Sequence, residues 1–453
     1  MLSKISISGY RGFSASQSMD FAVPNGEAGS GLTIISGSNN SGKSSIIEAL
    51  RARNGYQSPS FTNSMRNAKS DSVEIEYCVN GKNEAVRSIR PGSSETSRTG
   101  RDEQFHLFVL PSRRAFSPYF GKNDSDRHSY TNIYGLPTSR ASQLSGFEGR
   151  LFKIEKNPSA FNELLEKALG FKPKWSIDLS DQGQYFLKFI TGSNSHTSDG
   201  LGEGIVSIFA MADALYDSAA GNMVVIDEPE LSLHPSLQKR MSAIIAEYAK
   251  DRQIVISTHS PYFVDLSALG KGAHLVRVVS DEVTGTSIHQ LSDDSKQAIN
   301  GLITDINNPH VLGTNAKELF FQEDGIILTE GQEDVVLYPL VFDQVGKKLP
   351  GSFFGWGAGG AEKMEKIARI LKDLGFSKVV GILDSDKKEM ASTLEHKFPG
   401  YEFIRIPAKD VRTKPARKAT EAVAGLLDEK RILRPELVDE MIAIADKIIA
   451  KVD

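Results

Sequence analysis

Residues 37–44 read GSNNSGKS and match the pattern G-x-x-x-x-G-K-[ST]. An apolar run at 32–36 precedes this loop, and a helix is predicted over 44–53. Glycines let the backbone N–H groups turn toward phosphate oxygens, and the start of a helix adds positive potential. The loop therefore predicts a site for ATP.

Individual residues of this loop are expected to have separate roles in nucleotide binding. Lys43 should reach the β- and γ-phosphates, and Ser44 should ligate Mg²⁺. The other loop residues expected to surround the nucleotide are Gly37, Asn39, Asn40, Gly42 and Ser45.

A second run, MVVIDE at 223–228, ends an apolar strand with two acids. Asp227 would hold the Mg²⁺ shell, and Glu228 would orient or deprotonate the attacking water. The acids could also simply end a buried strand. A further apolar strand ends at His259, whose ring nitrogen could contact the γ-phosphate, and this favours a catalytic role for all three.

A third set of acids follows two later apolar runs, in ILTEGQEDVV (327–336) and VVGILDSDKK (379–388). Glu330, Asp384 and Asp386 lie just beyond strand ends, where open α/β sheets place their sites. Converging carboxylates repel one another unless a cation neutralises them, and Mg²⁺ or Mn²⁺ suits oxygen ligands. Taken one at a time, each acid could be an ordinary surface charge, but the joint spacing favours a metal site.

Composition limits the class of protein. The chain has 453 residues, 53 Lys plus Arg, 57 Asp plus Glu and a net charge of −4, which excludes a bulk polycation but allows a local basic groove. The single cysteine, Cys78, excludes a disulfide framework and a cysteine-built zinc site. No apolar run approaches the ~18 residues of a membrane helix, and the N-terminus lacks signal-peptide features. We expect a cytoplasmic protein without a membrane partner.

Strand and helix patterns alternate along the chain, which indicates an α/β fold. We expect an ATPase domain over 1–310, with an inserted helical or dimerisation segment at about 120–200, and a second domain over 311–453. The polar segment 292–315 is expected to link them, and no heptad repeat indicates a long coiled coil. Strands are predicted at 2–8, 32–36, 72–78, 105–110, 174–178, 184–190, 223–226, 253–257, 273–279, 285–291, 325–329, 351–355, 378–383 and 402–406, helices at 44–53, 158–168, 204–217, 236–249, 331–343, 361–374, 388–397 and 418–450, and loops at 91–103 and 116–145.

The segments DEPELSLHP (227–235) and ISTHSP (256–261) resemble the Walker B/D-loop and switch-histidine regions of ABC-type ATPases. The similarity is closest to the branch that contains recombination mediators, break-repair ATPases and the OLD (overcoming lysogenization defect) nucleases. In that branch two ATPase heads sandwich ATP and each supplies a signature loop to its partner. The resemblance thus implies a homodimer or higher homo-oligomer formed through the heads.

The segment that resembles the signature loop is SDGLGEG at 198–204. It would bring Gly202 and Gly204 to the partner's nucleotide. Gly202 stands where a serine often sits, so hydrolysis could be slow or could need a partner. The alternative is a glycine hinge before the helix at 204–217.

Two further arginine-bearing segments are candidates for the nucleotide site. The segment GYRGF (9–13) resembles the end of the family's first strand, which would place Arg11 near the nucleotide. Arg113 and Arg114 could sense phosphate or could be solvated surface residues.

The pattern E-G-x-x-D followed by D-x-D resembles a Toprim domain over roughly 315–453. Toprim is the metal-binding fold of topoisomerases, primases and some nucleases. The resemblance implies Glu330, Asp384 and Asp386 as the principal metal ligands and Asp334 as an accessory ligand. Glu333 could instead face solvent.

OLD-type Toprim domains carry further acidic and lysine residues in the region that corresponds to IPAKDVRTKP (406–415). Asp410 could therefore complete the metal shell, and Lys409 or Lys414 could stabilise the pentavalent phosphate. Residues 387–418 contain nine Lys or Arg against four Asp or Glu. This stretch could contact DNA phosphates or could form a solvated basic face.

An ABC-like ATPase followed by a Toprim unit is the order found in OLD-family proteins. The resemblance implies an ATP-controlled, Mg²⁺- or Mn²⁺-dependent DNA endonuclease that acts in defence against phage or mobile DNA, with a possible protein or nucleic-acid partner. The alternative is an ATP-driven DNA-binding or sensor scaffold of the recombination-mediator type. A topoisomerase or primase is less favoured, because no strand-passage tyrosine context or primase zinc motif is evident.

Overall fold

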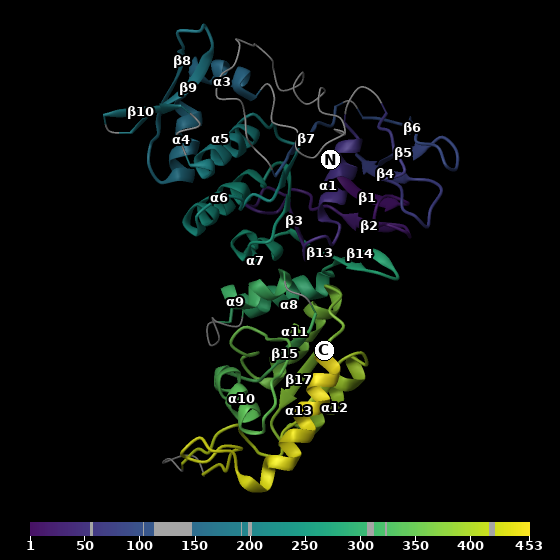
Figure 1. The fold of residues 1–453 in the computed structure, drawn as a ribbon, viewed down its shortest axis with the longest axis vertical. Coiled ribbons are helices and arrows are strands. Elements are labelled where there is room, and N and C mark those ends of the chain that lie inside the picture. The colour runs from purple at the N-terminus through teal and green to yellow at the C-terminus, as the bar shows by residue number, and fades with distance from the viewer. Residues whose placement is uncertain are drawn as a thin grey trace. The chain divides into compact units, whose positions relative to one another are not determined.

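A computed structural model (Figure 1) describes residues 1–54, 58–102, 104–112, 147–191, 193–197, 202–305, 312–321, 324–415 and 422–453. By its internal contacts the chain divides into two units, Met1–Gln290 and Leu291–Asp453. This division comes earlier than the boundary expected at 310 and 311. Much of the segment expected to be a link forms helix α8 (Asp293–Ile303), which packs on α11 (Ala361–Asp373) of the second unit.

A six-stranded sheet forms the centre of the first unit, in the order β14-β13-β3-β12-β11-β7. All neighbouring strands are parallel except the β13–β14 hairpin. Strands buried on both faces are continuously apolar, as in LTIIS and QIVIS, which are fully buried. The strands are β3 (Leu32–Ser36), β7 (Leu107–Leu110), β11 (Met223–Asp227), β12 (Gln253–Ser257), β13 (His274–Asp281) and β14 (Gly285–Gln290).

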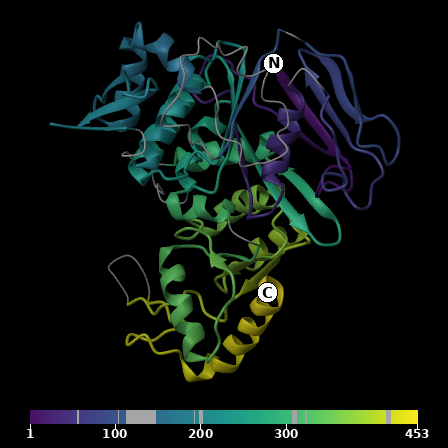
Figure 2. The same cartoon turned by 45° about the horizontal axis from the view of Figure 1, so that its top comes forward.

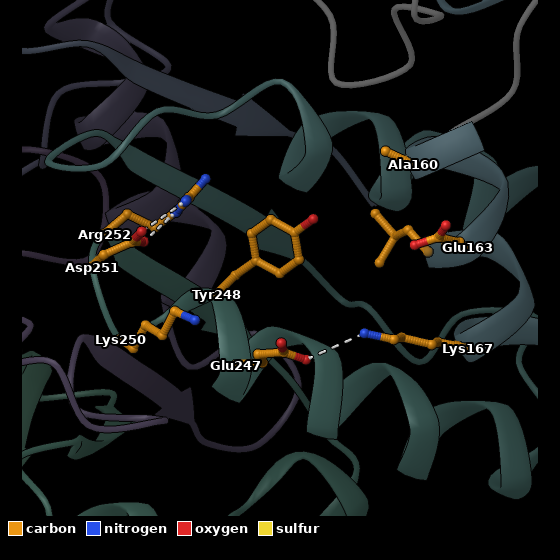
Figure 3. Close-up of a pocket in the computed structure, with 9 residues that line it drawn as sticks. Ala160, Glu163, Lys167, Glu247, Tyr248, Lys250, Asp251 and Arg252 are labelled. Atoms are coloured by element: carbon orange, nitrogen blue, oxygen red, sulfur yellow. Dashed lines mark hydrogen bonds and ion pairs between the residues drawn. The ribbon is translucent and has the colours of Figure 1, made fainter. Parts of the chain in front are cut away.

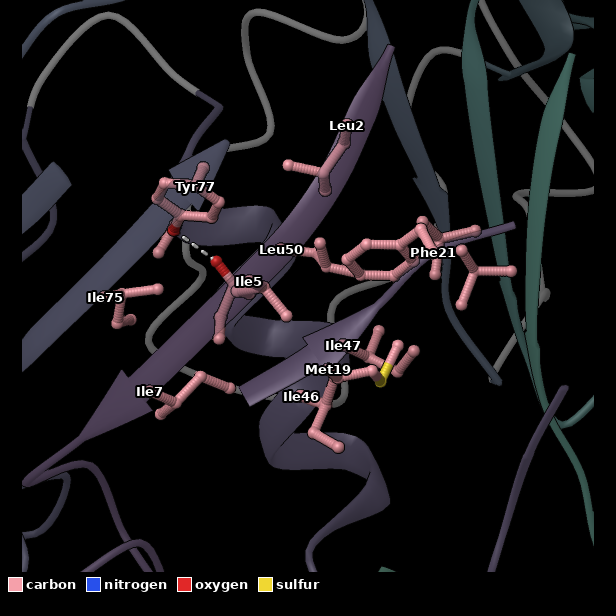
Figure 4. Packing of buried hydrophobic residues seen from close by; sticks show 14 of the residues in the cluster. Leu2, Ile5, Ile7, Met19, Phe21, Ile46, Ile47, Leu50, Ile75 and Tyr77 are labelled. Atoms are coloured by element: carbon pink, nitrogen blue, oxygen red, sulfur yellow. Dashed lines mark hydrogen bonds between the residues drawn. The ribbon is translucent and has the colours of Figure 1, made fainter. Parts of the chain in front are cut away.

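An antiparallel sheet covers helix α1 (Lys43–Ala52) on its other side, in the order β2-β1-β4-β5-β6. Figure 4 shows Ile46, Ile47 and Leu50 of α1 packed against side chains of this sheet. Each such buried side chain contributes about 1.5–3 kcal/mol relative to exposure. The helix that begins at Lys43 is therefore fixed by a core on two faces. The strands are β1 (Leu2–Ser8), β2 (Gln17–Asp20), β4 (Glu74–Val79), β5 (Lys82–Ser88) and β6 (Thr96–Thr99).

The rest of the first unit consists of helices and a small sheet in the order β10-β9-β8. Phe161 of α4 packs on Phe209 of α5, with 5.9 Å between ring centroids. The described part of the segment expected at 120–200 thus holds strands as well as helices. The elements are α3 (Phe147–Glu155), α4 (Ser159–Leu169), α5 (Glu203–Tyr216), α6 (Pro235–Tyr248), α7 (Leu266–Leu269), β8 (Lys174–Leu179), β9 (Tyr185–Thr191) and β10 (Asn194–Thr197).

The second unit has a parallel four-stranded sheet in the order β16-β15-β17-β18. Ile327, Val380 and Ile382 point to one face, where they join the core formed with α10 and α13. Figures 1 and 2 show α13 (yellow) running alongside this sheet. The elements are α9 (Thr314–Glu318), β15 (Ile326–Leu328), α10 (Gln332–Gln344), β16 (Ser352–Phe353), β17 (Val379–Leu383), α12 (Lys388–Lys397), β18 (Glu402–Arg405) and α13 (Val438–Val452).

Both units confirm the predicted α/β fold class. Within the described ranges, none of the helices is both long and apolar enough to cross a membrane.

Candidate functional site

A cavity of about 160 Å³ brings the predicted phosphate-binding residues together. The loop that follows β3, Glu228 after β11 and His259 after β12 all line it. These strands are neighbours in a parallel sheet, so their carboxyl ends meet at one edge, where α/β folds place ligands. The residues that line the cavity are Asn39, Asn40, Ser41, Gly42, Lys43, Ser44, Ser45, Glu228 and His259.

Lys43 is one of the residues that line this cavity. Its Nζ donates to the carbonyl oxygens of Gly37 and Ser38, at 3.0 and 2.9 Å. Burial lowers the pKa of Lys43 to about 8, and the carboxylates of Glu228 and Asp227 oppose that decrease. The side chain thus remains mostly protonated at pH 7, as a phosphate-binding lysine must be.

Two buried hydroxyl groups near the loop test whether an oxygen-rich ligand fits. Ser41 Oγ and Ser257 Oγ are buried and have no hydrogen-bond partner among the described residues. Buried polar groups in folded proteins are normally hydrogen-bonded. These two hydroxyl groups can donate hydrogen bonds to phosphate oxygens. Ser44 and Asp227 supply oxygen atoms of the kind that Mg²⁺ takes as ligands.

Glycine is required at two positions of the loop, because other strands approach it closely. A Cβ on Gly37 would lie 2.3 Å from the carbonyl oxygen of Val278, and one on Gly42 would lie 2.9 Å from Cγ2 of Thr286. Both glycines have positive φ, 145° and 112°. Thr286 also donates its backbone N–H to the carbonyl oxygen of Gly12, at 2.8 Å. Sequence reasoning missed Thr286, which no local motif marks.

Glu228 and His259 occupy the two strand ends beside the loop. Glu228 has a φ of +48°, a conformation that costs a non-glycine residue about 1–3 kcal/mol and that clusters at active sites. Its N–H donates to the carbonyl oxygen of Ser257, at 2.8 Å. Burial and the charge of Lys43 lower the pKa of His259, so its imidazole is neutral at pH 7. Glu228, whose backbone is strained, and the neutral imidazole of His259 therefore share the cavity with Lys43.

Glu230, two residues beyond Glu228, is a second functional candidate that sequence reasoning left without a role. Its carboxylate accepts hydrogen bonds from Thr258 Oγ1 at 2.7 Å and from the backbone N–H of His259 at 2.6 Å. The motif DEPELSLHP contains this residue, but its spacing alone does not reveal the contact.

Five residues predicted near the nucleotide do not line the cavity, namely Arg11, Gly37, Gly202, Gly204 and Asp227. Arg11 pairs with Glu48 of α1, at 2.6 Å. Gly202 precedes α5, and a Cβ on Gly204 would lie 2.5 Å from the carbonyl oxygen of Ser232. Gly204 thus allows α5 to approach the loop that follows β11. The expected contacts of these residues with nucleotide stay predictions, and Arg113, Arg114 and 198–201 lie outside the described residues.

The predicted metal ligands of the second unit gather at the carboxyl end of its sheet. Glu330 follows β15 and Asp384 follows β17, and Glu330 Oε1 accepts a hydrogen bond from the N–H of Asp384 at 2.9 Å. Asp334, in the first turn of α10, accepts from the N–H of Gly331 at 2.8 Å. Neighbouring parallel strands therefore place these carboxylates beside one another.

Electrostatics show how closely the acids lie. Burial, together with the charges of Glu330, Asp334, Asp410 and Asp386, raises the pKa of Asp384 to about 8. Burial also raises the pKa of Asp334, to about 6, and that of Glu330. The acidic cluster, defined here as these five residues, thus carries negative charge that its surroundings do not fully compensate.

The basic residues beside the acidic cluster already have partners. Lys414 pairs with Asp410, Arg412 pairs with Glu333 at 2.6 Å, and Lys387 pairs with Asp386 at 3.4 Å. Glu333, which sequence reasoning left open to solvent, is about half exposed in this pair. Four of the nine basic residues counted over 387–418, namely Lys387, Lys397, Arg412 and Lys414, are therefore held in ion pairs.

The acidic cluster is not a preformed metal cage. Over the described parts of the chain, no three His, Cys, Asp or Glu side chains are arranged so that they could hold a metal ion. The chemistry of the donors suits Mg²⁺ or Mn²⁺, but these carboxylates would have to move closer together to bind one.

Two family models match the first unit. One, "AAA ATPase domain", covers residues 1–89, and the other, "AAA domain, putative AbiEii toxin, Type IV TA system", covers 100–265. Between them they include the phosphate loop, Glu228 and His259. The chain carries an ATPase domain of the AAA type.

Further relatives resemble parts of the chain. An OLD nuclease of Thermus scotoductus (strain ATCC 700910 / SA-01) is 33% identical over 128 residues, which is 27% of this chain and 23% of the nuclease. An SMC head domain from Thermotoga maritima (16% identity, TM-score 0.37) covers 64% of this chain and 99% of its own. A Pyrococcus furiosus Smc head domain bound to the C-terminal domain of ScpA (14% identity, TM-score 0.43) covers 67% and 99%. The ATPase assignment rests on the family models and the cavity.

A larger cavity of about 320 Å³ lies between α4 and the end of α6 in the ATPase domain (Figure 3). Its charged residues form pairs, such as Lys167 with Glu247 at 3.9 Å and Arg252 with Asp251 at 2.7 Å. It lacks a loop of backbone N–H groups like that of the nucleotide cavity, and we assign it no role.

Proposed function

We propose that this protein is an ATP-controlled nuclease that cleaves or nicks DNA with Mg²⁺ or Mn²⁺, like the OLD nucleases. The observation that carries the proposal is the acidic cluster at the carboxyl end of a parallel sheet, in the same chain as an ATPase domain. The match to an OLD nuclease supports it. In this proposal the second unit is a Toprim domain, and the protein acts in the cytoplasm against phage or mobile DNA.

In the ATPase domain we assign the phosphates of ATP to the loop over 37–45. Lys43 holds the β- and γ-phosphates, and Ser44 and Asp227 hold Mg²⁺. Glu228 orients the attacking water and accepts its proton, for which its place in the cavity beside Lys43 is suited. The neutral ring of His259 hydrogen-bonds the γ-phosphate. Gly202 and Gly204 lie away from this cavity, which supports their use by the partner head of a dimer.

In the second unit we assign the metal to Glu330, Asp384 and Asp386, with Asp334 and Asp410 as accessory ligands. A bound divalent cation would lower the pKa of water and stabilise the leaving oxygen of a phosphodiester. Lys414, held in place by Asp410, would stabilise the charge that develops on the phosphate.

A second candidate function is an ATP-driven DNA-binding scaffold in which the acidic cluster is structural. The lack of a ready metal group among the described residues favours it. It predicts ATP-dependent assembly on DNA without any cleavage.

Supercoiled plasmid distinguishes the two functions. The purified protein is incubated with plasmid and Mg²⁺ or Mn²⁺, with and without ATP, beside Asp384→Ala and Lys43→Ala. Nuclease function predicts nicked or linear plasmid with wild type and loss of cutting in Asp384→Ala. Intact plasmid under every condition, together with ATP-dependent retention on DNA, would support the scaffold.

A further inference from the structure

We propose that Glu230 is a positioning residue for ATP hydrolysis, which fixes His259 against the phosphate loop through the histidine's own backbone. This inference rests on the proposed roles in the ATPase domain and does not depend on the nuclease. It gives a role to a carboxylate that lies beside the cavity without lining it.

The contact geometry supports this role. The two carboxylate oxygens of Glu230 accept from different groups, Oε2 from Thr258 Oγ1 at 2.7 Å and Oε1 from the N–H of His259 at 2.6 Å. Thr258 Oγ1 in turn accepts from the N–H of Ser260, at 3.0 Å. One side chain therefore holds three consecutive residues of the turn that carries the imidazole.

The position of Glu230 explains why this matters for catalysis. Glu228 and Glu230 lie on the same loop after β11, whereas His259 follows the neighbouring strand β12. Among the described residues, the imidazole of His259 forms no ion pair and no ring contact. Its place in the cavity therefore depends on the position of its backbone. The bridge from Glu230 thus sets the imidazole in register with the residue that orients water.

Burial makes this bridge specific. The side chain is largely removed from solvent, and its pKa is raised by burial although the hydrogen bonds from His259 and Thr258 oppose the increase. Few groups can replace a buried acceptor, because water does not reach it freely. Loss of the carboxylate would leave the N–H of His259 without its partner and free the turn to move.

The same loop also reaches helix α5. Ser232 Oγ donates to Glu203 Oε2, at 2.8 Å, and Gln238 Oε1 accepts from Ser260 Oγ, at 2.6 Å. The loop between β11 and α6 thus contacts the start of α5 through Ser232, and helix α6 contacts the turn of His259 through Gln238. Glu230 is the member of this loop that contacts His259 itself.

The experiment is a double-mutant cycle. Steady-state ATP hydrolysis is measured for wild type, Glu230→Ala, His259→Ala and the double variant, and affinity is measured separately with a fluorescent ATP analogue. We expect Glu230→Ala to lower kcat by about 10- to 100-fold and to change the Kd less than about twofold. In the His259→Ala background the same substitution should have almost no further effect, because the two residues act as one unit.

Two further variants separate positioning from folding. Thr258→Val removes the hydrogen bond to Glu230 and the acceptor of the Ser260 N–H, but it leaves the hydrogen bond from the N–H of His259 to Glu230, so it should give a smaller loss of kcat. Glu247→Gln, at an exposed ion pair on α6, is the matched control and should hydrolyse ATP like wild type. If Glu230→Ala does not fold, the cycle is run with Thr258→Val.

Hydrogen exchange keeps the inference testable if hydrolysis is absent. The amide of His259 should exchange faster in Glu230→Ala than in wild type, whether or not the protein turns over ATP. A full loss of kcat that persists in the His259→Ala background would overturn the inference, and so would unchanged exchange at His259. Wild type that binds but never hydrolyses ATP would instead count against the proposed ATPase roles.

Discussion

The nucleotide cavity and the acidic cluster both lie at the carboxyl ends of parallel strands, but their carboxylates are compensated to different degrees. In the cavity, Lys43 lies among the carboxylates of Asp227 and Glu228, so cation and anions are matched before any ligand arrives. In the acidic cluster, burial and then the neighbouring carboxylates raise the pKa of Asp384. In the first site the lysine and the carboxylates oppose one another's charge, whereas in the second site several carboxylates lie together.

The largest effect that we predict concerns a carboxylate whose charge is compensated by a buried arginine. Glu84 is buried and pairs with Arg53 in the first unit, at 2.7 Å. Removal of one partner leaves an uncompensated buried charge, so Glu84→Ala should lower the free energy of unfolding by about 3–5 kcal/mol. Chemical denaturation measures this loss. Glu74→Ala, in an exposed pair with Arg87, should change stability by less than about 1 kcal/mol.

Lys43→Ala should weaken ATP binding by about 100-fold, or about 2.7 kcal/mol, because the phosphates lose their buried cation. Titration with a fluorescent ATP analogue gives the Kd. The exposed Lys250→Ala should bind ATP as wild type does. Equal affinity of Lys43→Ala and wild type for ATP would contradict the contrast between the cavity and the acidic cluster. The charges of Lys43, Asp227 and Glu228 would then serve folding rather than binding.

Asp384→Asn should have the opposite sign to Glu84→Ala and stabilise the second unit by about 1 kcal/mol without metal, because folding then no longer buries and protonates a carboxyl whose pKa is raised to about 8. Thermal unfolding without Mg²⁺ measures the gain, and added Mg²⁺ should stabilise wild type more than the variant. Asp386→Asn is the control, since Asp386 is about half exposed and pairs with Lys387. A destabilised Asp384→Asn would mean that the acidic cluster is already compensated.

The smallest effect concerns the pH dependence that Glu230 gives to the first unit. Burial raises the pKa of this carboxyl above its ordinary value of 4.5. A raised carboxyl pKa means that stability is lost as pH rises from about the ordinary value through the raised one. The unfolding free energy of wild type minus that of Glu230→Gln should thus decrease slightly as the pH rises from about 4. A difference that is flat with pH would contradict this.

Sequence patterns predicted the elements whose apolar period is strong. The ends of β1, β3, β12 and α12 lie where the sequence placed them. The predicted loop at 91–103 was wrong in part, because β6 (Thr96–Thr99) is a polar edge strand that pairs with β5. The link at 292–315 was also wrong in part, although Ser292 caps α8 and Asp293 and Asp294 follow it, a readable helix start.

The sequence predicts a helical tail over 418–450 in which Pro435 opens the last helix, and of this tail the structure confirms the last helix but not a helix over the described residues before Pro435. Helix α13 covers Val438–Val452, after a single turn at Pro435–Leu437. Among the residues before it, Gly425 packs so closely that a Cβ would lie 2.1 Å from the backbone of Arg412. Such a close approach across the fold overrides local helix propensity.

The candidate sites divide in the same way. Motif spacing identified the phosphate loop, Glu228 and His259, which the structure brings to one cavity. Thr286 was not predictable, because it reaches the loop from 245 residues away in sequence. The ion pairs of Asp410 and Asp386 were not predictable either, since spacing does not reveal which lysine folds back onto which acid.

The contact of Thr286 with the phosphate loop has a mechanical consequence. Thr286 lies in β14, which ends at Gln290, and the second unit begins at the next residue. At about 3.4 Å per residue, the covalent path between Thr286 and that junction is roughly 13 Å long. Because Thr286–Gln290 is paired with β13 over its whole length, the phosphate loop and the junction are connected by strand and not by slack chain.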